Sequence, residues 1–173
     1  MTKPVVYAGS FDPITNGHAD IIRRAARVFG AVRVVVFNSP CKRPLFTVQE
    51  RMDLIRQNTA DIPGVSVDSY GGLLVDYLEQ NGLNVVVRGV RGPADAEAEA
   101  AYAHANRLLN PDIEIVWLPA DPSLCFVSSS AVRESFSYGR ELPGYVSEQT
   151  ARALRAKIAA VSSSRHTKGP ETK

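Results

Sequence analysis

Four polar strings of this 173-residue chain carry side chains of the kinds that bind phosphate. They lie at residues 9–18, in the loop around Lys42, at residues 88–91 and at residues 128–130. Hydroxyl, imidazole, ammonium and guanidinium groups all donate hydrogen bonds to phosphate oxygens, and the last two also neutralise their charge. The strings therefore predict a site for a nucleoside triphosphate, with room beside it for a second, phosphate-bearing substrate.

The first string lies between an apolar run at residues 5–8 and a helical pattern that starts at His18. A glycine after a strand, such as Gly9, allows a ligand to approach the backbone closely. Free backbone N–H groups and the helix dipole favour an anion where the helix begins, and Ser10 and His18 would flank that anion. The alternative is a hydroxyl-capped turn with a histidine on the helix surface. An isolated Thr-x-Gly-His favours that alternative, whereas the complete string favours the anion site.

Two basic strings follow predicted strands. Lys42 is a compact positive charge that suits the bridging of phosphates from two substrates, although any single loop lysine is by default solvated. Its loop follows the strand predicted at residues 32–37, on the edge where a ligand is expected, and this favours the bridging role. Arg88 and Arg91 flank a glycine at another strand end and offer planar, multidentate donors, although such arginine pairs are also common on surfaces.

Ser128, Ser129 and Ser130 stand at the start of a predicted helix. One hydroxyl there would be explained by N-capping, because it satisfies an unpaired backbone N–H group. Three hydroxyls exceed that need, and the surplus suits triphosphate oxygens. Elsewhere, Trp117 lies on an apolar strand and is predicted to be core. No cluster of His, Cys, Asp and Glu has transition-metal spacing, so the sequence predicts no metal ligand from the protein.

Strand and helix patterns alternate along the chain. Apolar runs predict strands at residues 5–8, 32–37, 65–69, 85–87 and 113–118. Helices are predicted at residues 18–29, after a capping box at 47–50, at 73–80, at 93–109, from 128 onward, and from 147 to about 161.

This order predicts a single Rossmann-like α/β domain at residues 1–161, with a five-stranded, mostly parallel sheet and helices on both faces. Such sheets bind ligands at the carboxyl ends of their strands, so the four strings should converge on one rim. The polar remainder, residues 162–173, is predicted to be a disordered C-terminal tail.

The composition is that of an ordinary globular protein, with 45% hydrophobic and 22% charged residues. A net charge of +2 is too small to indicate a nucleic-acid or membrane partner. The chain shows no secretory signal and no apolar run of about 20 residues. Two cysteines are too few for a disulfide framework. These features predict a cytoplasmic protein.

The first string resembles the first signature of the adenylyltransferase superfamily whose hallmark is (H/T)xGH, represented here by Thr15-Asn16-Gly17-His18. Together, the strings are similar to the phosphopantetheine adenylyltransferase family of bacterial coenzyme A biosynthesis. Four patterns of that family have counterparts in the same order here. They are P-G-(T/S)-F-D-P-x-T-x-G-H, N-P-x-K-x-P-x-F-x-x-x-E-R, R-G-L-R and (I/V)-S-S-S-x-x-(R/K)-E. The chain departs from the family at four positions, which are Ala8 for proline, Ala96 and Ala98 for the aromatic residues of D-F-E-Y-E, and Leu124 where an aromatic residue often stands.

The resemblance implies transfer of AMP from ATP to 4′-phosphopantetheine, which gives dephospho-coenzyme A and pyrophosphate. His18 would stabilise the transition state at the α-phosphate, and Lys42 with Ser10 would orient the attacking phosphate. The implied acceptor-binding residues are Ser10, Lys42, Leu74 and Arg88. The implied ATP-binding residues are Ser10, Phe11, His18, Gly89, Val90, Arg91, Glu99, Leu124, Cys125, Phe126, Val127, Ser128, Ser129 and Ser130.

Further implications concern ions, regulation and assembly. Mg²⁺ would bridge the triphosphate and be held mainly by substrate and water. Coenzyme A would be a feedback ligand, and the chain would form a homo-oligomer, a hexamer by analogy with the family. For Glu99, contact with the nucleotide and a solvated place on a helix face are equally open.

Two rival functions remain at the level of sequence. One is a transferase on the same fold that acts on nicotinamide mononucleotide or on an alcohol phosphate such as glycerol 3-phosphate. The Lys42 loop and the arginine string favour phosphopantetheine over these acceptors. The other is a non-catalytic nucleotide-binding domain, which the missing aromatic residues at Ala96, Ala98 and Leu124 keep open.

Overall fold

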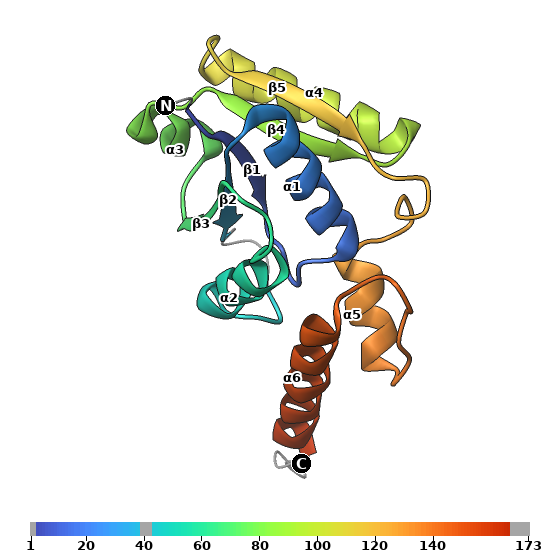
Figure 1. Ribbon diagram of the computed structural model, residues 1–173. Helices are drawn as coiled ribbons and strands as arrows, with labels where there is room; N and C mark the ends of the chain where they lie inside the picture. Colours follow the sequence, from blue (N-terminus) through green and yellow to red (C-terminus); the bar gives the residue numbers. More distant parts are fainter. Residues whose placement is uncertain (1–2, 39–42, 167–173) are drawn as a thin grey trace.

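The computed structural model describes residues 3–38 and 43–166, the last five by their backbone only. Five strands form one sheet in the order β3-β2-β1-β4-β5, and each pair of neighbours is parallel (Figure 1). The prediction of a five-stranded α/β domain is confirmed. The strands are β1 (Val5–Gly9), β2 (Val32–Phe37), β3 (Val65–Tyr70), β4 (Val85–Val90) and β5 (Glu114–Pro119).

Six helices connect and follow the strands. They are α1 (Asn16–Phe29), α2 (Val48–Asn58), α3 (Leu74–Asn81), α4 (Pro93–Leu109), α5 (Ser129–Ser137) and α6 (Glu148–His166). Helix α6 continues past its expected end near Val161, because the sequence contains no glycine or proline between that residue and Gly169. The rest of the predicted tail, residues 167–173, lies outside the described residues.

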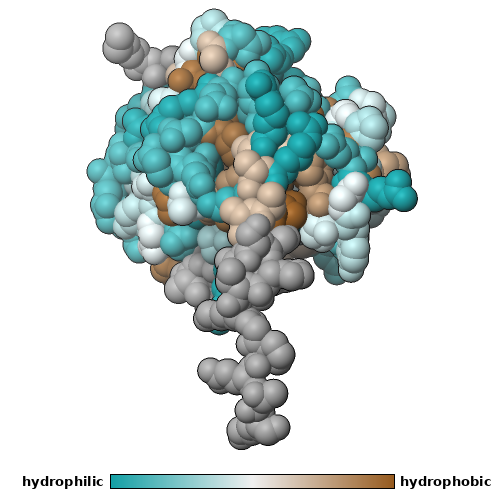
Figure 2. Space-filling view, turned by 90° about the horizontal axis from the view of Figure 1, so that it is seen from below, coloured by the Kyte–Doolittle hydropathy of each residue, from teal (hydrophilic) through white to brown (hydrophobic). Residues whose placement is uncertain are grey.

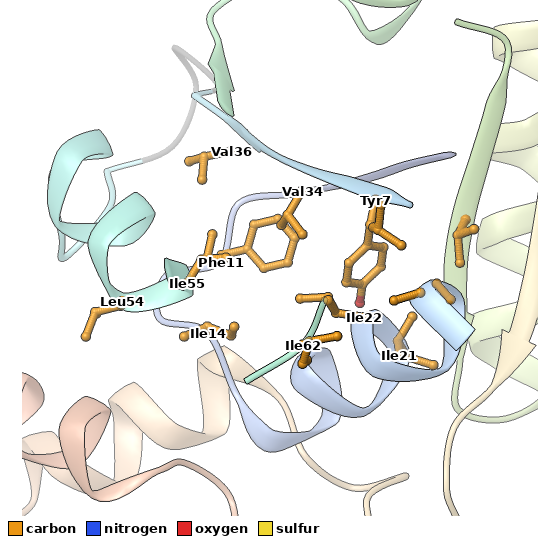
Figure 3. Packing of buried hydrophobic residues seen from close by; sticks show 14 of the residues in the cluster. Tyr7, Phe11, Ile14, Ile21, Ile22, Val34, Val36, Leu54, Ile55 and Ile62 are labelled. Atoms are coloured by element: carbon orange, nitrogen blue, oxygen red, sulfur yellow. The ribbon is translucent and has the colours of Figure 1, made fainter. Parts of the chain in front are cut away.

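The core has two halves, one on each face of the sheet. Alternate side chains of β1 point to opposite faces, so Tyr7 belongs to a cluster that includes residues of α1, α2, α5 and α6, while Val6 belongs to one that includes residues of α3. Figure 3 shows the first half, in which Phe11 lies beside Val34 and Tyr7 points toward α1. Helices therefore cover both faces, as predicted.

The prediction for Trp117 is wrong, because this side chain is 40% exposed. Trp117 lies on β5, which is at the edge of the sheet and pairs only with β4. An apolar run has the same appearance in an edge strand as in a central strand, since its periodicity carries no information about its neighbours.

The surface in Figure 2 is mostly hydrophilic, with hydrophobic residues gathered near the middle of the view. Among the described residues, none of the helices combines the length and apolar character needed to cross a lipid bilayer.

We expect Ile22→Ala to lower the free energy of unfolding by about 2–5 kcal/mol, because Ile22 is fully buried between α1 and the sheet and its truncation leaves a cavity. Val28→Ala is the matched control, since Val28 lies on the same helix but is 66% exposed. Urea denaturation should show a change within about 0.5 kcal/mol for the control. Equal losses in both variants would contradict this account of the core.

Candidate active site

A cleft of about 640 Å³ lies at the carboxyl ends of the strands. Its lining includes the ends of β1, β2 and β4 and the first residues of α1 and α5. Three of the four polar strings thus converge on one rim, as predicted. The described part of the fourth, Asn38 and Arg43, also lines the cleft, whereas Lys42 lies outside the described residues.

Most of the predicted site residues meet in this cleft. Those in the lining are Ser10, Phe11, His18, Arg88, Gly89, Arg91, Glu99, Leu124, Val127, Ser128, Ser129 and Ser130. Leu74, Val90, Cys125 and Phe126 are not in the lining. Leu74 is the first residue of α3 and is buried in the core, and Phe126 is 82% exposed.

Helix α1 begins with a capping box in which a histidine takes the place usually held by Glu or Gln. The backbone N–H of His18 donates to Thr15 Oγ1 at 3.4 Å, and the backbone N–H of Thr15 donates to His18 Nδ1 at 3.1 Å. A backbone N–H is always a donor, so Nδ1 accepts and the proton of the neutral ring is assigned to Nε2. The Thr-x-Gly-His spacing thus fixes both the orientation of the ring and its tautomer.

The His18 ring is held in its neutral form. Burial, together with the nearby positive charges of Arg91 and Arg88, lowers the pKa of His18 to about 4. The ring lies edge-on to Phe11, with 5.1 Å between the ring centroids. At neutral pH, His18 therefore offers one N–H donor, on Nε2, without a positive charge of its own.

A strained turn follows β1. Phe11 has φ of 46°, in the left-handed region that bulky residues rarely adopt, and its side chain is only 2% exposed. A Cβ at Gly9 would lie 3.1 Å from the Phe11 ring, so glycine gives that ring its space. Non-glycine residues keep such a conformation only where their surroundings enforce it.

Asp12 ties this turn to the rest of the rim. Its buried carboxylate accepts the backbone N–H groups of Leu45 and Phe46, each at 2.9 Å. The Arg133 guanidinium lies 3.5 Å from the same carboxylate and donates to the Asp12 carbonyl oxygen. One residue therefore joins the first turn, the segment after Lys42 and helix α5.

Arg51 provides a second tie from α2. It is 1% exposed, and its terminal nitrogens donate to Ser10 O and Asn38 Oδ1, each at 2.9 Å. Its Nε also donates to Thr47 O at 3.4 Å. The Arg51 side chain thus fixes the ends of β1 and β2 relative to each other.

Arg88 and Arg91 each form an ion pair with a carboxylate of α4. Arg88 Nε and Nη2 donate to Glu99 at 2.7 and 2.5 Å, and Nη1 donates to Ala8 O at 2.7 Å. Arg91 Nε and Nη2 donate to Asp95 at 3.2 and 2.9 Å. Neither arginine is a freely solvated surface cation.

Glu99 is buried against Arg88 and is not a solvated helix residue. Its direct contact with a nucleotide stays a prediction.

The three serines have different local partners. Ser128 Oγ accepts from the backbone N–H of Ala131 at 3.1 Å, which is the capping role. Ser129 Oγ donates to Pro13 O at 2.8 Å and joins α5 to the first loop, and Ser130 Oγ accepts from Arg133 Nη2 at 3.4 Å. All three line the cleft. The capping explanation therefore holds for Ser128, and the other two hydroxyls exceed it, as the sequence indicated.

The cleft carries an excess of positive charge. Its described lining contains five arginines against three carboxylates, which favours a ligand with several negative charges. Among the described residues, no group of three His, Cys, Asp or Glu side chains could hold a metal ion. The arrangement can bind phosphates and stabilise negative charge that develops on them.

Sequence reasoning gave no site role to several lining residues, which are Tyr7, Asp12, Thr15, Asn38, Arg51, Asp95, Tyr102 and Arg133. Asp12 and Arg51 belong to the first string and to the string around Lys42, as the acid of F-D-P and the arginine of E-R. Their polar character within these strings was a signal. However, the partners of Asp12 lie 33 or more residues away along the chain, and the Ser10 carbonyl that Arg51 contacts lies 41 residues away. Only the fold identifies such partners.

Residues 6–135 match the model of a family described as cytidylyltransferase-like. Among solved structures, a bifunctional NMN adenylyltransferase/ADP ribose pyrophosphatase from Francisella tularensis is similar over 84% of this chain and 45% of its own, with 17% identity and a TM-score of 0.64. Another structure with that description and organism, complexed with AMP and an Mn ion, is similar over 100% of this chain and 58% of its own (15% identity, TM-score 0.63).

A lipopolysaccharide core biosynthesis protein from Thermoplasma volcanium GSS1 is similar over 68% of this chain and 95% of its own (18% identity, TM-score 0.50). The present chain spans about half the length of the two Francisella structures. At these identities, the likeness concerns the fold.

We expect NMR titration of the His18 ring to give a midpoint near pH 4, with the proton of the neutral form on Nε2. Since this pKa lies below the ordinary value of 6.5, His18 contributes stability above pH 6.5 that is lost as the pH falls toward 4. A midpoint near 6.5 would contradict the account of burial and charge around the ring, and a proton on Nδ1 would contradict the capping-box assignment.

Proposed function

Because the chain belongs to the cytidylyltransferase-like family of nucleotidyltransferases, we propose that it transfers AMP from ATP to 4′-phosphopantetheine, giving dephospho-coenzyme A and pyrophosphate. The observation that carries this proposal is the convergence of His18, the two arginines at the end of β4 and the serines at the start of α5 in one cleft. These groups can bind one triphosphate and one further phosphate side by side.

His18 has the properties that the transfer requires. In the proposed reaction the acceptor phosphate attacks the α-phosphorus, the bond to the β-phosphate oxygen breaks, and pyrophosphate leaves. The attacking phosphate is already an anion, so no general base is needed. The neutral ring would donate Nε2–H to an α-phosphate oxygen as its charge changes, and a preorganised donor of this kind can lower the barrier by several kcal/mol (~3).

Two substrates would divide the rim between them. In the proposal, Arg88, Ser10 and Lys42 serve the acceptor phosphate, while Arg91 and the serines of α5 serve ATP. Lys42 would bridge the phosphates and offset their repulsion. Coenzyme A as a feedback ligand, a homohexamer and a cytoplasmic location belong to the same proposal and rest on the family resemblance.

Mg²⁺ fits this site as an ion carried by the nucleotide. The carboxylates of the described lining are already engaged: Asp12 by backbone N–H groups, and Asp95 and Glu99 by arginines. Triphosphate oxygens and water would therefore supply most of its ligands. When bound, Mg²⁺ neutralises phosphate charge.

Nicotinamide mononucleotide is the second candidate acceptor. The structures similar in fold include two described as a bifunctional NMN adenylyltransferase/ADP ribose pyrophosphatase, and this favours testing that acceptor directly. In our proposal, the basic loop around Lys42 and the arginine string favour phosphopantetheine.

Pyrophosphate release from MgATP will distinguish these functions. We expect release with 4′-phosphopantetheine and little with nicotinamide mononucleotide, with glycerol 3-phosphate or without an acceptor. Preferential release with nicotinamide mononucleotide or glycerol 3-phosphate would replace the proposed acceptor. ATP binding without turnover on any acceptor would favour the non-catalytic alternative.

We expect His18→Ala to lower turnover by roughly 10²–10³-fold, because it removes the Nε2–H donor. His18→Gln is the comparison: the glutamine carbonyl oxygen can keep the capping-box hydrogen bond from the Thr15 backbone, and its amide N–H can partly replace the lost donor, so its loss should be smaller. Near-normal turnover of the alanine variant would refute the role of His18.

A further inference from the structure

Both arginines at the end of β4 are held in the same way by carboxylates of α4. Glu99 accepts from Nε and Nη2 of Arg88, and Asp95 accepts from Nε and Nη2 of Arg91. Asp95 and Glu99 are four residues apart, so they share one face of the helix. Helix α4 therefore presents two carboxylates, one turn apart, to two guanidinium groups that line the cleft.

The contact with Asp95 leaves one edge of Arg91 for a ligand. A guanidinium group carries five N–H bonds, one on Nε and two on each terminal nitrogen. Within the described part of the chain, Nη1 of Arg91 donates to no protein group, and the side chain is 44% exposed. The remaining Nη1 and Nη2 bonds form a fork that matches two oxygens of a phosphate.

Asp95 is itself fixed by the fold. Its Oδ2 accepts the backbone N–H of Arg91 at 3.0 Å, and it lies in the first turn of α4, where a negative charge is favoured. The hydrogen bond from the Arg91 side chain lowers the pKa of Asp95, so the carboxylate stays ionised at neutral pH. One turn further on, the buried Glu99–Arg88 pair holds α4 against β4.

We propose that Asp95 is a positioning residue for ATP, which holds the Arg91 guanidinium from its Nε side so that the Nη1 edge is presented to the triphosphate. This inference rests on the proposed function, because it takes ATP as the ligand on the Arg91 side.

A carboxylate near a triphosphate has two opposing effects. Its charge repels the phosphates, while its hydrogen bonds hold the arginine that binds them. Asp95 is already paired with Arg91, so a phosphate meets a close ion pair in a solvated rim, where the net repulsion is small. In catalysis, in contrast, misplacing a group by about 1 Å can cost ~10²-fold in rate, and a fork that binds two phosphate oxygens is also sensitive to its position. Positioning therefore outweighs repulsion.

The test is the affinity for MgATP, measured by titration calorimetry on the full chain. We expect Asp95→Asn to raise Kd about tenfold, a factor that corresponds to an ordinary coupling between neighbouring groups. Glu97→Gln is the matched control, because it removes one charge from an exposed position on the same helix, and it should change Kd by less than about twofold. Circular dichroism should show α4 intact in both variants.

A double-mutant cycle separates positioning from a general structural effect. In an Arg91→Ala background, Asp95→Asn should cause no further loss of affinity, because the side chain that Asp95 positions is gone. Binding by Asp95→Asn as tight as or tighter than wild type would overturn the proposal, and so would equal weakening in both backgrounds. If the wild-type chain binds no MgATP, the proposed function fails and this inference fails with it. If the wild-type chain binds MgATP and the Asp95→Asn variant binds it equally well, only this inference is refuted.

Discussion

The buried carboxylate of Asp12 is the contact on which the geometry of the site depends. A charge withdrawn from water is tolerated only when hydrogen bonds and opposite charges surround it. Asp12 obtains these from the backbone of Leu45 and Phe46 and from Arg133, so three separate segments must meet at this point. With Arg51 bound to the Ser10 carbonyl, this meeting point encloses Phe11 and keeps its backbone in the left-handed region. The strain at Phe11 is thus maintained by contacts that also assemble the rim.

The charges around His18 are also balanced. Arg88 and Arg91 are close enough to disfavour a protonated imidazole, yet each is paired with a carboxylate of α4. The rim therefore combines directional donors with moderate net charge. Preorganised donors of this kind stabilise charge in a reacting group without having to reorganise at the moment of reaction.

The sequence predicted the architecture well, because its elements are local. The apolar run of β2 and the capping box of α2 are complete within short stretches, and both elements lie where their patterns indicated. The convergence of the polar strings was also predictable, since carboxyl ends of parallel strands share one edge. Trp117 shows the limit of such reasoning: an apolar strand says nothing about how many strands flank it, and β5 has only one neighbour.

By itself, then, the amino-acid sequence determined the order of the elements, the rim on which the site lies and the chemical nature of its donors, because periodicity, capping and motif spacing are properties of contiguous residues. Tertiary structure alone decided which charges pair across long stretches of the chain. Asp12 meets Arg133 across 121 residues, and Arg88 could have paired with any of several acids before the fold brought Glu99 to it. Pairing depends on distance and burial in space, and a linear sequence holds neither. The state of the His18 ring depends on both the sequence and the fold. The spacing places the ring at the cap, and its surroundings in the folded protein keep it neutral.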